Sequence, residues 1–138
     1  MDPDSLLDRL QRATNDHDVD AIVACFSPEF RNETPAHPSR GFGGREQVGK
    51  NWEVILAAVP DLTARVLRSS LDGHALWTEW EHRGTRRDGR PHLMRGVVIF
   101  GVRDGLFDWA RFYLEPVQDD GLGVDEFVRR QLGSAVVA

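Results

Sequence analysis

Residues 63–117 read TARVLRSSLDGHALWTEWEHRGTRRDGRPHLMRGVVIFGVRDGLFDWARFYLEPV and contain three Asp-Gly pairs. The pairs, at 72–73, 88–89 and 104–105, separate runs in which apolar and polar residues alternate. Asp-Gly favours the tight turns that join antiparallel strands, because both residues tolerate a positive φ. The pattern therefore predicts a meander of four strands, over 63–71, 75–85, 91–102 and 107–117.

The region before this meander has helical periodicity instead. Apolar residues three and four positions apart predict a first helix capped by Ser5, and a second helix from Asp18 to Phe26. A third helix is predicted over about 45–59 by one broad apolar stripe. Residues 30–44 are rich in proline and glycine, which predicts a long loop of the kind that often borders a site.

Helices followed by an antiparallel sheet are the order of an α+β domain. We expect the third helix to cover one face of a curved sheet, leaving a cavity lined by alternate strand positions. The 138 residues are expected to form a single domain over 1–138, with its core over 5–117. Residues 118–138 are acidic and weakly helical, and this tail is expected to dock on the domain or on a second subunit.

Composition excludes several classes of protein. The chain is 41% hydrophobic and 28% charged, as an ordinary globular protein is. Its net charge of −5 and scattered basic residues argue against a nucleic-acid partner. The one basic cluster surrounds Asp88-Gly89, and we interpret it as a solvated turn rather than an anion site. That cluster consists of Arg83, Arg86, Arg87 and Arg90.

Apolar runs such as Val97–Phe100 are too short to span a bilayer, and the N-terminus lacks the features of a secretory signal. We therefore expect a cytoplasmic location and no membrane partner. The single cysteine, Cys25, lies in an apolar stretch, which predicts a buried thiol rather than a nucleophile. Zinc-binding Cys and His pairs, GxGxxG and the P-loop are absent from the sequence, so we expect no metal and no cofactor.

The segment His92–Pro116, HLMRGVVIFGVRDGLFDWARFYLEP, ends in Arg111-x-Tyr113-x-Glu115 after an Asp-Gly turn. With the two short helices, the Gly-rich loop and the third helix, it resembles the SnoaL-like polyketide cyclase group of the nuclear transport factor 2-like superfamily, over about residues 5–117. The resemblance implies a cone-shaped antiparallel sheet, about four main strands plus a short one, wrapped around three helices. It also implies a homodimer, formed through the outer face of the sheet.

The same resemblance implies which face of the last strand is functional. Trp109, Arg111, Tyr113 and Glu115 share one face, and the family turns this face towards the cavity, with an acidic residue near the strand end. Glu115 is therefore a candidate pocket carboxylate, with a strand-end ion pair as the alternative. An apolar wall would raise the pKa of its carboxyl group, whereas pairing with Arg111 or Arg95 would hold it ionised.

His82 is the second candidate for chemistry. It shares a face of its strand with Trp80 and occupies the place where epoxide hydrolases of this fold have a catalytic Asp, with Trp80 in place of their Arg. This argues against epoxide hydrolysis by that mechanism. A near-neutral pKa suits His82 to general-base catalysis, with a satisfied sheet histidine as the alternative. Facing one cavity, His82 and Glu115 would form an acid/base pair.

Other side chains are expected to bind or polarise a ligand. Tyr113 is suited to donate a hydrogen bond to an oxyanion, and three tryptophans are suited to wall a hydrophobic cavity. Two unlinked histidines, His37 and His82, do not predict a metal site. The predicted catalytic residues are His82, Glu115, Tyr113 and Arg111, and the predicted substrate-binding residues are Asn32, Glu33, His37, Trp52, Trp80, Arg95 and Trp109.

The superfamily holds cyclases, isomerases, hydrolases, dehydratases and binders, so the site must decide the function. Our first hypothesis is a cofactor-independent cyclase or isomerase-type enzyme that uses general acid/base catalysis on a hydrophobic, carbonyl-containing, polyketide-like small molecule. The alternative is a non-catalytic ligand-binding or dimerisation module of the same fold. A third reading, protein transport, needs an exposed partner surface that the sequence does not reveal.

Overall fold

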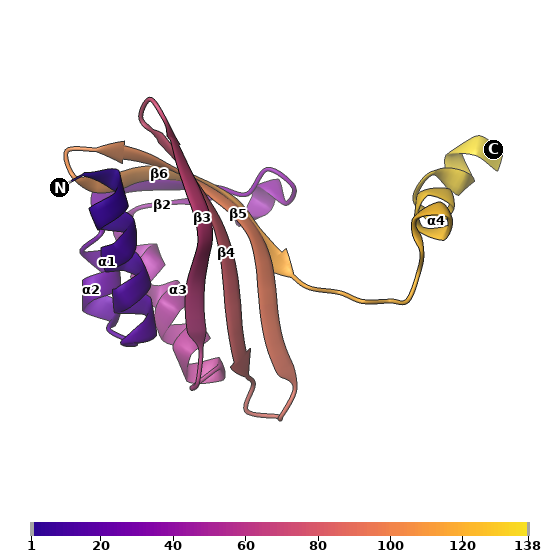
Figure 1. The fold of residues 1–138 in the computed structure, drawn as a ribbon, viewed down its shortest axis with the longest axis horizontal. Coiled ribbons are helices and arrows are strands. Elements are labelled where there is room, and N and C mark those ends of the chain that lie inside the picture. The colour runs from indigo at the N-terminus through magenta and orange to yellow at the C-terminus, as the bar shows by residue number, and fades with distance from the viewer. Residues whose placement is uncertain (1, 138) are drawn as a thin grey trace.

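The computed structural model describes residues 2–137, with side chains through 133. Three helices lie against one face of a curved, unclosed sheet (Figure 1). These are α1 (Pro3–Asn15), α2 (Val19–Val23) and α3 (Arg45–Ala58). The strands are β1 (Phe26–Glu33), β2 (Phe42–Gly43), β3 (Thr63–Asp72), β4 (Ala75–Thr85), β5 (Pro91–Arg103) and β6 (Leu106–Pro116). A 3₁₀ helix, η1 (Pro38–Arg40), precedes β2, and α4 (Val124–Val137) follows the sheet.

The predicted meander is confirmed. Strands β3 to β6 pair antiparallel in sequence order, and the sheet runs β2-β1-β6-β5-β4-β3. Each Asp-Gly pair joins two of these strands, and Gly73, Gly89 and Gly105 all have a positive φ. An L-residue with a side chain rarely adopts that conformation, which is why these turns use glycine.

The predicted strand count was wrong, because residues 2–137 form six strands and four α-helices. The second helix ends at Val23 rather than Phe26, and β1 replaces the start of the predicted loop. β1 runs parallel to β6, so the sheet is not purely antiparallel. Its register is irregular between Phe26 and Arg31, which accommodates Pro28 without a ladder hydrogen bond. The buried Phe26 and Phe30 are four residues apart, a spacing that places two residues on one face of a strand as well as of a helix.

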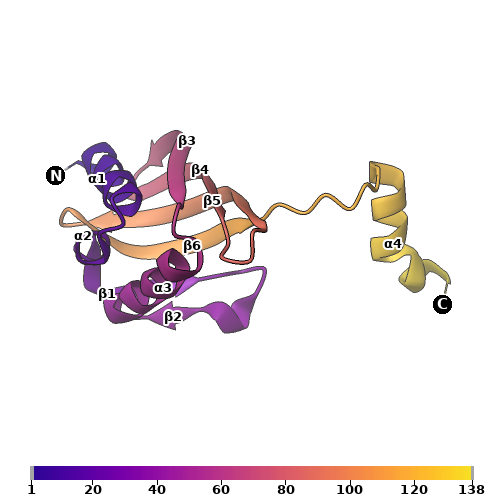
Figure 2. The same ribbon diagram turned by 90° about the horizontal axis from the view of Figure 1, so that it is seen from below.

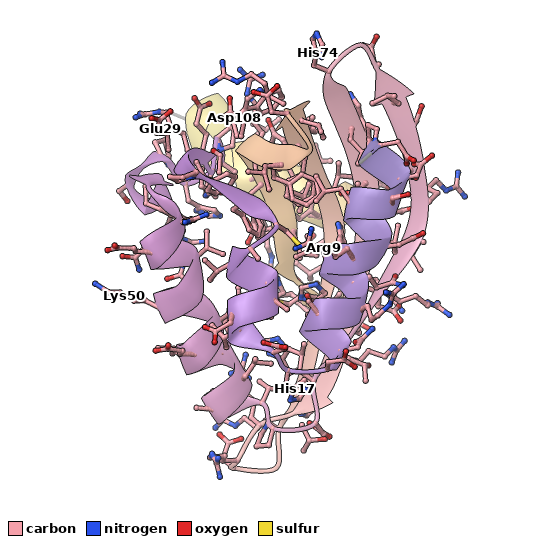
Figure 3. All side chains as sticks on the ribbon, turned by 90° about the vertical axis from the view of Figure 1, so that its left-hand side faces the viewer. Arg9, His17, Glu29, Lys50, His74 and Asp108 are labelled. Atoms are coloured by element: carbon pink, nitrogen blue, oxygen red, sulfur yellow. The ribbon has the colours of Figure 1, made fainter. Side chains whose placement is uncertain are left out.

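Polar side chains of α1 attach the helical layer to the edge strand β3. The Asn15 amide donates to the Ala64 carbonyl at 2.9 Å and accepts from the Ala64 N–H at 2.7 Å. Gln11 Oε1 accepts from the Val66 N–H at 2.6 Å. These bonds satisfy backbone groups that an uncovered edge strand would leave open. Figure 3 looks onto this layer, with His17 at the end of the α1–α2 pair.

The helix caps differ from the prediction in one place. α1 begins at Pro3, and its N-cap is Asp2, whose carboxylate accepts from the Ser5 N–H at 2.9 Å; Ser5 itself is not the cap. Asp18, where the second helix was predicted to begin, caps α2, and its carboxylate accepts a hydrogen bond from the Ala21 N–H. Carboxylates at these positions also interact favourably with the positive end of the helix dipole.

The core lies between the helices and the sheet. Leu6 and Ile22 from the helices and Leu76 from β4 are fully buried in it. Phe100 and Phe107 stack with their ring centroids 4.1 Å apart. Cys25 is buried among these apolar residues, as predicted, and its burial raises the pKa of the thiol.

Beyond Pro116 the chain leaves the sheet as an extended segment and ends in α4, which stands apart from the rest of the molecule (Figures 1 and 2). Within the described residues, no helix combines the length and the apolar character needed to cross a membrane.

The close approach of β5 and β6 at Gly96 yields the first testable prediction. Gly96 has a φ of 152°, and a Cβ there would overlap the Tyr113 carbonyl and the Leu114 backbone. We expect Gly96→Ala to lower the free energy of unfolding by about 1–3 kcal/mol, the usual cost of one strained backbone position. Urea denaturation measures this loss. Gly123→Ala is the matched control, because nothing lies near a Cβ at that position, and an equal effect of both substitutions would contradict the explanation.

Candidate active site

A cavity of about 560 Å³ lies between the helical layer and the sheet. Most of its lining is apolar, with Phe26, Phe30, Val48, Met94 and Val98 among the contributors. The polar side chains that reach it are few. They are Thr14, Asn32, Thr34, Arg40, Asn51, His82 and Glu115. A cavity of this size and character suits a hydrophobic small molecule with a few polar atoms.

His82 is the titratable group held inside this cavity by β4. Its ring lies 5.9 Å from the Trp52 ring and 5.7 Å from the Trp80 ring, measured between centroids. Burial, and to a lesser extent the nearby His92, lowers the pKa of His82 from its ordinary value of 6.5 to about 4. The imidazole is therefore neutral at pH 7, with one nitrogen able to donate and the other to accept a hydrogen bond.

Hydrogen bonds in the sheet fix the wall beside His82. The Trp80 Nε1–H donates to Thr78 Oγ1 at 2.8 Å, and the Thr78 hydroxyl donates to the Val98 carbonyl at 2.6 Å. The indole N–H is thus already satisfied, which leaves the His82 ring as the polar group on this part of the wall. Trp52 and Trp80 both line the cavity, as predicted.

Glu115 lies on β6, two strands from His82, and its half-exposed side chain marks the open side of the cavity. One of its carboxylate oxygens is 3.1 Å from His37 Nε2, and the other is 4.0 Å from an Arg40 guanidinium nitrogen. β1 ends opposite Arg111, so β6 has a free edge beyond that residue, where the loop containing His37 meets the Glu115 side chain. The loop predicted to border the site therefore supplies the partners of Glu115.

The predicted cavity face of β6 was the wrong one. Ala110, Phe112 and Leu114 line the cavity, whereas Trp109, Arg111 and Tyr113 do not. The cause is a β-bulge: Val102 pairs with Phe107 but Gly101 pairs with Trp109, so Asp108 is an extra residue without a partner. One extra residue exchanges the inward and outward sets from that point on.

Trp109, Arg111 and Tyr113 lie on the outer face of the sheet, where they have other neighbours. The Arg111 guanidinium lies 5.9 Å from the centre of the Trp109 ring and 3.5 Å from a Glu33 carboxylate oxygen. Tyr113 is 40% exposed. These three residues, together with Glu33, were expected at the site and do not line the cavity.

Arg95 likewise points away from the cavity. Its Nε donates to a Glu81 carboxylate oxygen at 2.9 Å, and the Arg83 Nε donates to the other oxygen at 2.7 Å. These two hydrogen bonds lower the pKa of Glu81 to about 2. Arg95 was predicted to bind the substrate, but it forms an ion pair with Glu81 and does not line the cavity.

The structure thus gathers five predicted site residues in one cavity: Asn32, Trp52, Trp80, His82 and Glu115. His37 joins them through Glu115. The prediction missed Thr14, Thr34, Arg40 and Asn51, which carry no signal in the sequence beyond being polar. Among the described residues, no group of three His, Cys, Asp or Glu side chains is placed to hold a metal ion.

The sequence matches the SnoaL-like domain family over residues 7–110. The fold is similar to that of wild-type IdmH from Streptomyces antibioticus, with a TM-score of 0.70 and 23% identity over 96% of this chain and 99% of that one. A loop-truncation variant of IdmH is 25% identical, with a TM-score of 0.69, over 83% of this chain and 93% of the other.

A further similar structure is that of SalBIII, an epoxide hydrolase/cyclase-like enzyme with a role in pyran ring formation in the polyether salinomycin. It is 19% identical, with a TM-score of 0.70, over 83% of this chain and 90% of that one. Among curated proteins, no match to this sequence was found.

The depressed pKa of His82 predicts a pH dependence of stability. Unfolded His82 takes up a proton as the pH falls through 6.5, but the folded state resists protonation until about pH 4. The contribution of His82 to the free energy of unfolding is therefore fully present above pH 6.5, and it is lost as the pH falls from 6.5 towards 4. Between pH 7 and pH 5 the loss from His82 amounts to roughly 2 kcal/mol.

Urea denaturation of the wild type and of His82→Gln at both pH values measures this loss. The difference between the two proteins isolates His82 together with its interaction with His92, because the burial that lowers the pKa of His92 is common to both. Equal pH dependence in the two proteins would contradict the burial of an uncharged His82.

Proposed function

Since the chain belongs to the SnoaL-like domain family, we propose that it is a cyclase or isomerase-type enzyme acting on a hydrophobic, carbonyl-containing small molecule. It uses general acid/base catalysis by its own side chains. The observation that carries this proposal is the uncharged His82 imidazole, held between Trp52 and Trp80 in an apolar cavity.

A proton acceptor in this position suits the formation of an enolate. The neutral ring takes a proton from the carbon next to a carbonyl group, and the resulting imidazolium lies beside the negative charge that it has created. In a cavity of low dielectric constant this attraction is strong and raises the pKa of His82 during the reaction. The low pKa of His82 thus keeps the base unprotonated before the reaction without preventing proton transfer.

The second proton is assigned to the Glu115–His37 pair at the open side. The two side chains lie 3.1 Å apart and are about 40% exposed, so water reaches both of them. A ligand long enough to extend from His82 to this pair loses a proton to His82 at one end and receives a proton from the pair at the other. Intramolecular aldol closure, double-bond isomerisation and dehydration all need this kind of transfer.

A non-catalytic binding role is the second candidate. It is favoured by the placement of the acidic group, because Glu115 already has His37 and Arg40 as partners. In that case the cavity selects a hydrophobic ligand by its shape and by the flat walls of Trp52 and Trp80. Binding without turnover is the outcome that separates this role from catalysis.

The test is exchange of the acidic proton of polycyclic ketones in D₂O, followed by NMR. This readout does not require the natural reaction to be known. We expect the wild type to catalyse exchange in at least one ketone of the panel. His82→Gln should slow that exchange by about 10²–10⁴-fold, the usual contribution of a general base, while fluorescence quenching of Trp52 and Trp80 shows that the ketone still binds.

His74→Gln is the matched control, because His74 lies at the tip of the β3–β4 hairpin, away from the helical layer (Figure 3). Its rate should equal that of the wild type. If the wild type binds the ketones tightly but catalyses proton exchange in none of them, the result would instead favour the binding module. An unchanged rate in His82→Gln would remove His82 from the mechanism.

A further inference from the structure

Helix α4 carries an apolar stripe that no other described part of the chain covers. Val124, Phe127, Val128 and Leu132 are between 45% and 74% exposed, and they recur three and four positions apart on one side of the helix. Figures 1 and 2 show the helix standing away from the sheet and from α1–α3. An isolated helix of this length is only marginally stable in water, so the stripe needs a partner surface.

A matching groove lies along α3. We define the α3 groove by Val54, Ile55 and Ala58 of α3 together with Arg86 and Arg87 of the β4–β5 turn. Val54 is 69% exposed, an unusual degree for a large apolar side chain. Val54 and Ile55 also line the main cavity, so whatever fills the groove borders the cavity as well.

The charges of the groove and of the tail are complementary. The turn carries Arg86 and Arg87, for which no carboxylate partner is found among the described side chains; Arg87 Nε donates to the Ala57 carbonyl. Asp88, also at the groove, is occupied by Arg90 at 3.6 Å. The segment before α4 and its first turn are acidic, which suits them to lie against these arginines. Asp119, Asp120 and Asp125 supply this negative charge, because Glu126 already pairs with Arg129 and Arg130 of α4 at 3.0 and 2.8 Å.

The segment between the sheet and α4 directs the helix outward. Asp119 Oδ1 accepts from the Gly121 N–H, and Asp120 Oδ1 accepts from the Leu122 N–H, which makes two successive local turns. Gly121 adopts a φ of 77°, which suits glycine. In this conformation α4 lies where a second molecule, and not its own groove, can meet it.

We propose that α4 of a second copy of this chain occupies the α3 groove. Each copy has one uncovered helix and one uncovered groove, so a two-fold exchange covers both pairs of surfaces at once. The second copy's helix then lies over Val54 and Ile55 and closes that side of the cavity. The proposal does not depend on whether the cavity is catalytic.

The test is cross-linking between two variants of the full chain, each with one added cysteine. Val54→Cys, carrying an affinity tag, is mixed with untagged Phe127→Cys and treated with a short bis-maleimide. The native Cys25 does not interfere because it is fully buried. We expect a product at the summed mass of the two chains, linked between positions 54 and 127 by peptide mapping.

The matched control replaces Val54→Cys by Leu71→Cys, which is exposed on the β3–β4 hairpin outside the groove. It should give no such product. A second preparation carries both Val54→Cys and Phe127→Cys in one chain. A link within that chain, with none in the mixture, would show that α4 covers its own groove and would overturn the proposal. Absence of any 54–127 link, or equal yield in the Leu71→Cys control, overturns it too.

Discussion

Burial of one face of the β4–β6 meander against α1–α3 is the constraint on which the rest of the structure depends. Consecutive residues of a strand point to opposite sides of a sheet, so burying Leu76 and Trp80 assigns a side to every other residue of β4. His82 enters the cavity for this reason. The strand register then fixes which residues of β5 and β6 face the same side, because Trp80 pairs with Gly96 and Gly96 pairs with Leu114.

The two edges of the sheet complete the cavity in different ways. At the β3 edge, Gln11 and Asn15 bond to the strand backbone and hold α1 in place. At the other edge, β1 and β2 extend the sheet, and the segment between them brings His37 and Arg40 to Glu115. The cavity is therefore walled by covered strands on one side and bordered by a charged cluster on the other.

The two faces of the sheet place ionisable groups in opposite electrostatic settings. Inside, loss of hydration keeps His82 uncharged at neutral pH. Outside, hydrogen bonds from Arg83 and Arg95 keep Glu81 charged down to about pH 2. A proton acceptor in an apolar, aromatic cavity is suited to chemistry on a hydrophobic molecule, whereas the outer cluster stabilises charge and does not line the cavity.

The sequence by itself determined the four meander strands, the third helix and the burial of Cys25, because Asp-Gly turns and apolar spacing are local signals. It also placed Trp80 and His82 on one face of β4. Only the tertiary structure decided that β1 is a strand and that Tyr113 faces outward. The physical reason is that a single unpaired residue, Asp108, reverses the faces of β6 without changing its alternation. The contact of Glu115 with His37 was equally out of reach, because it joins residues far apart in the chain.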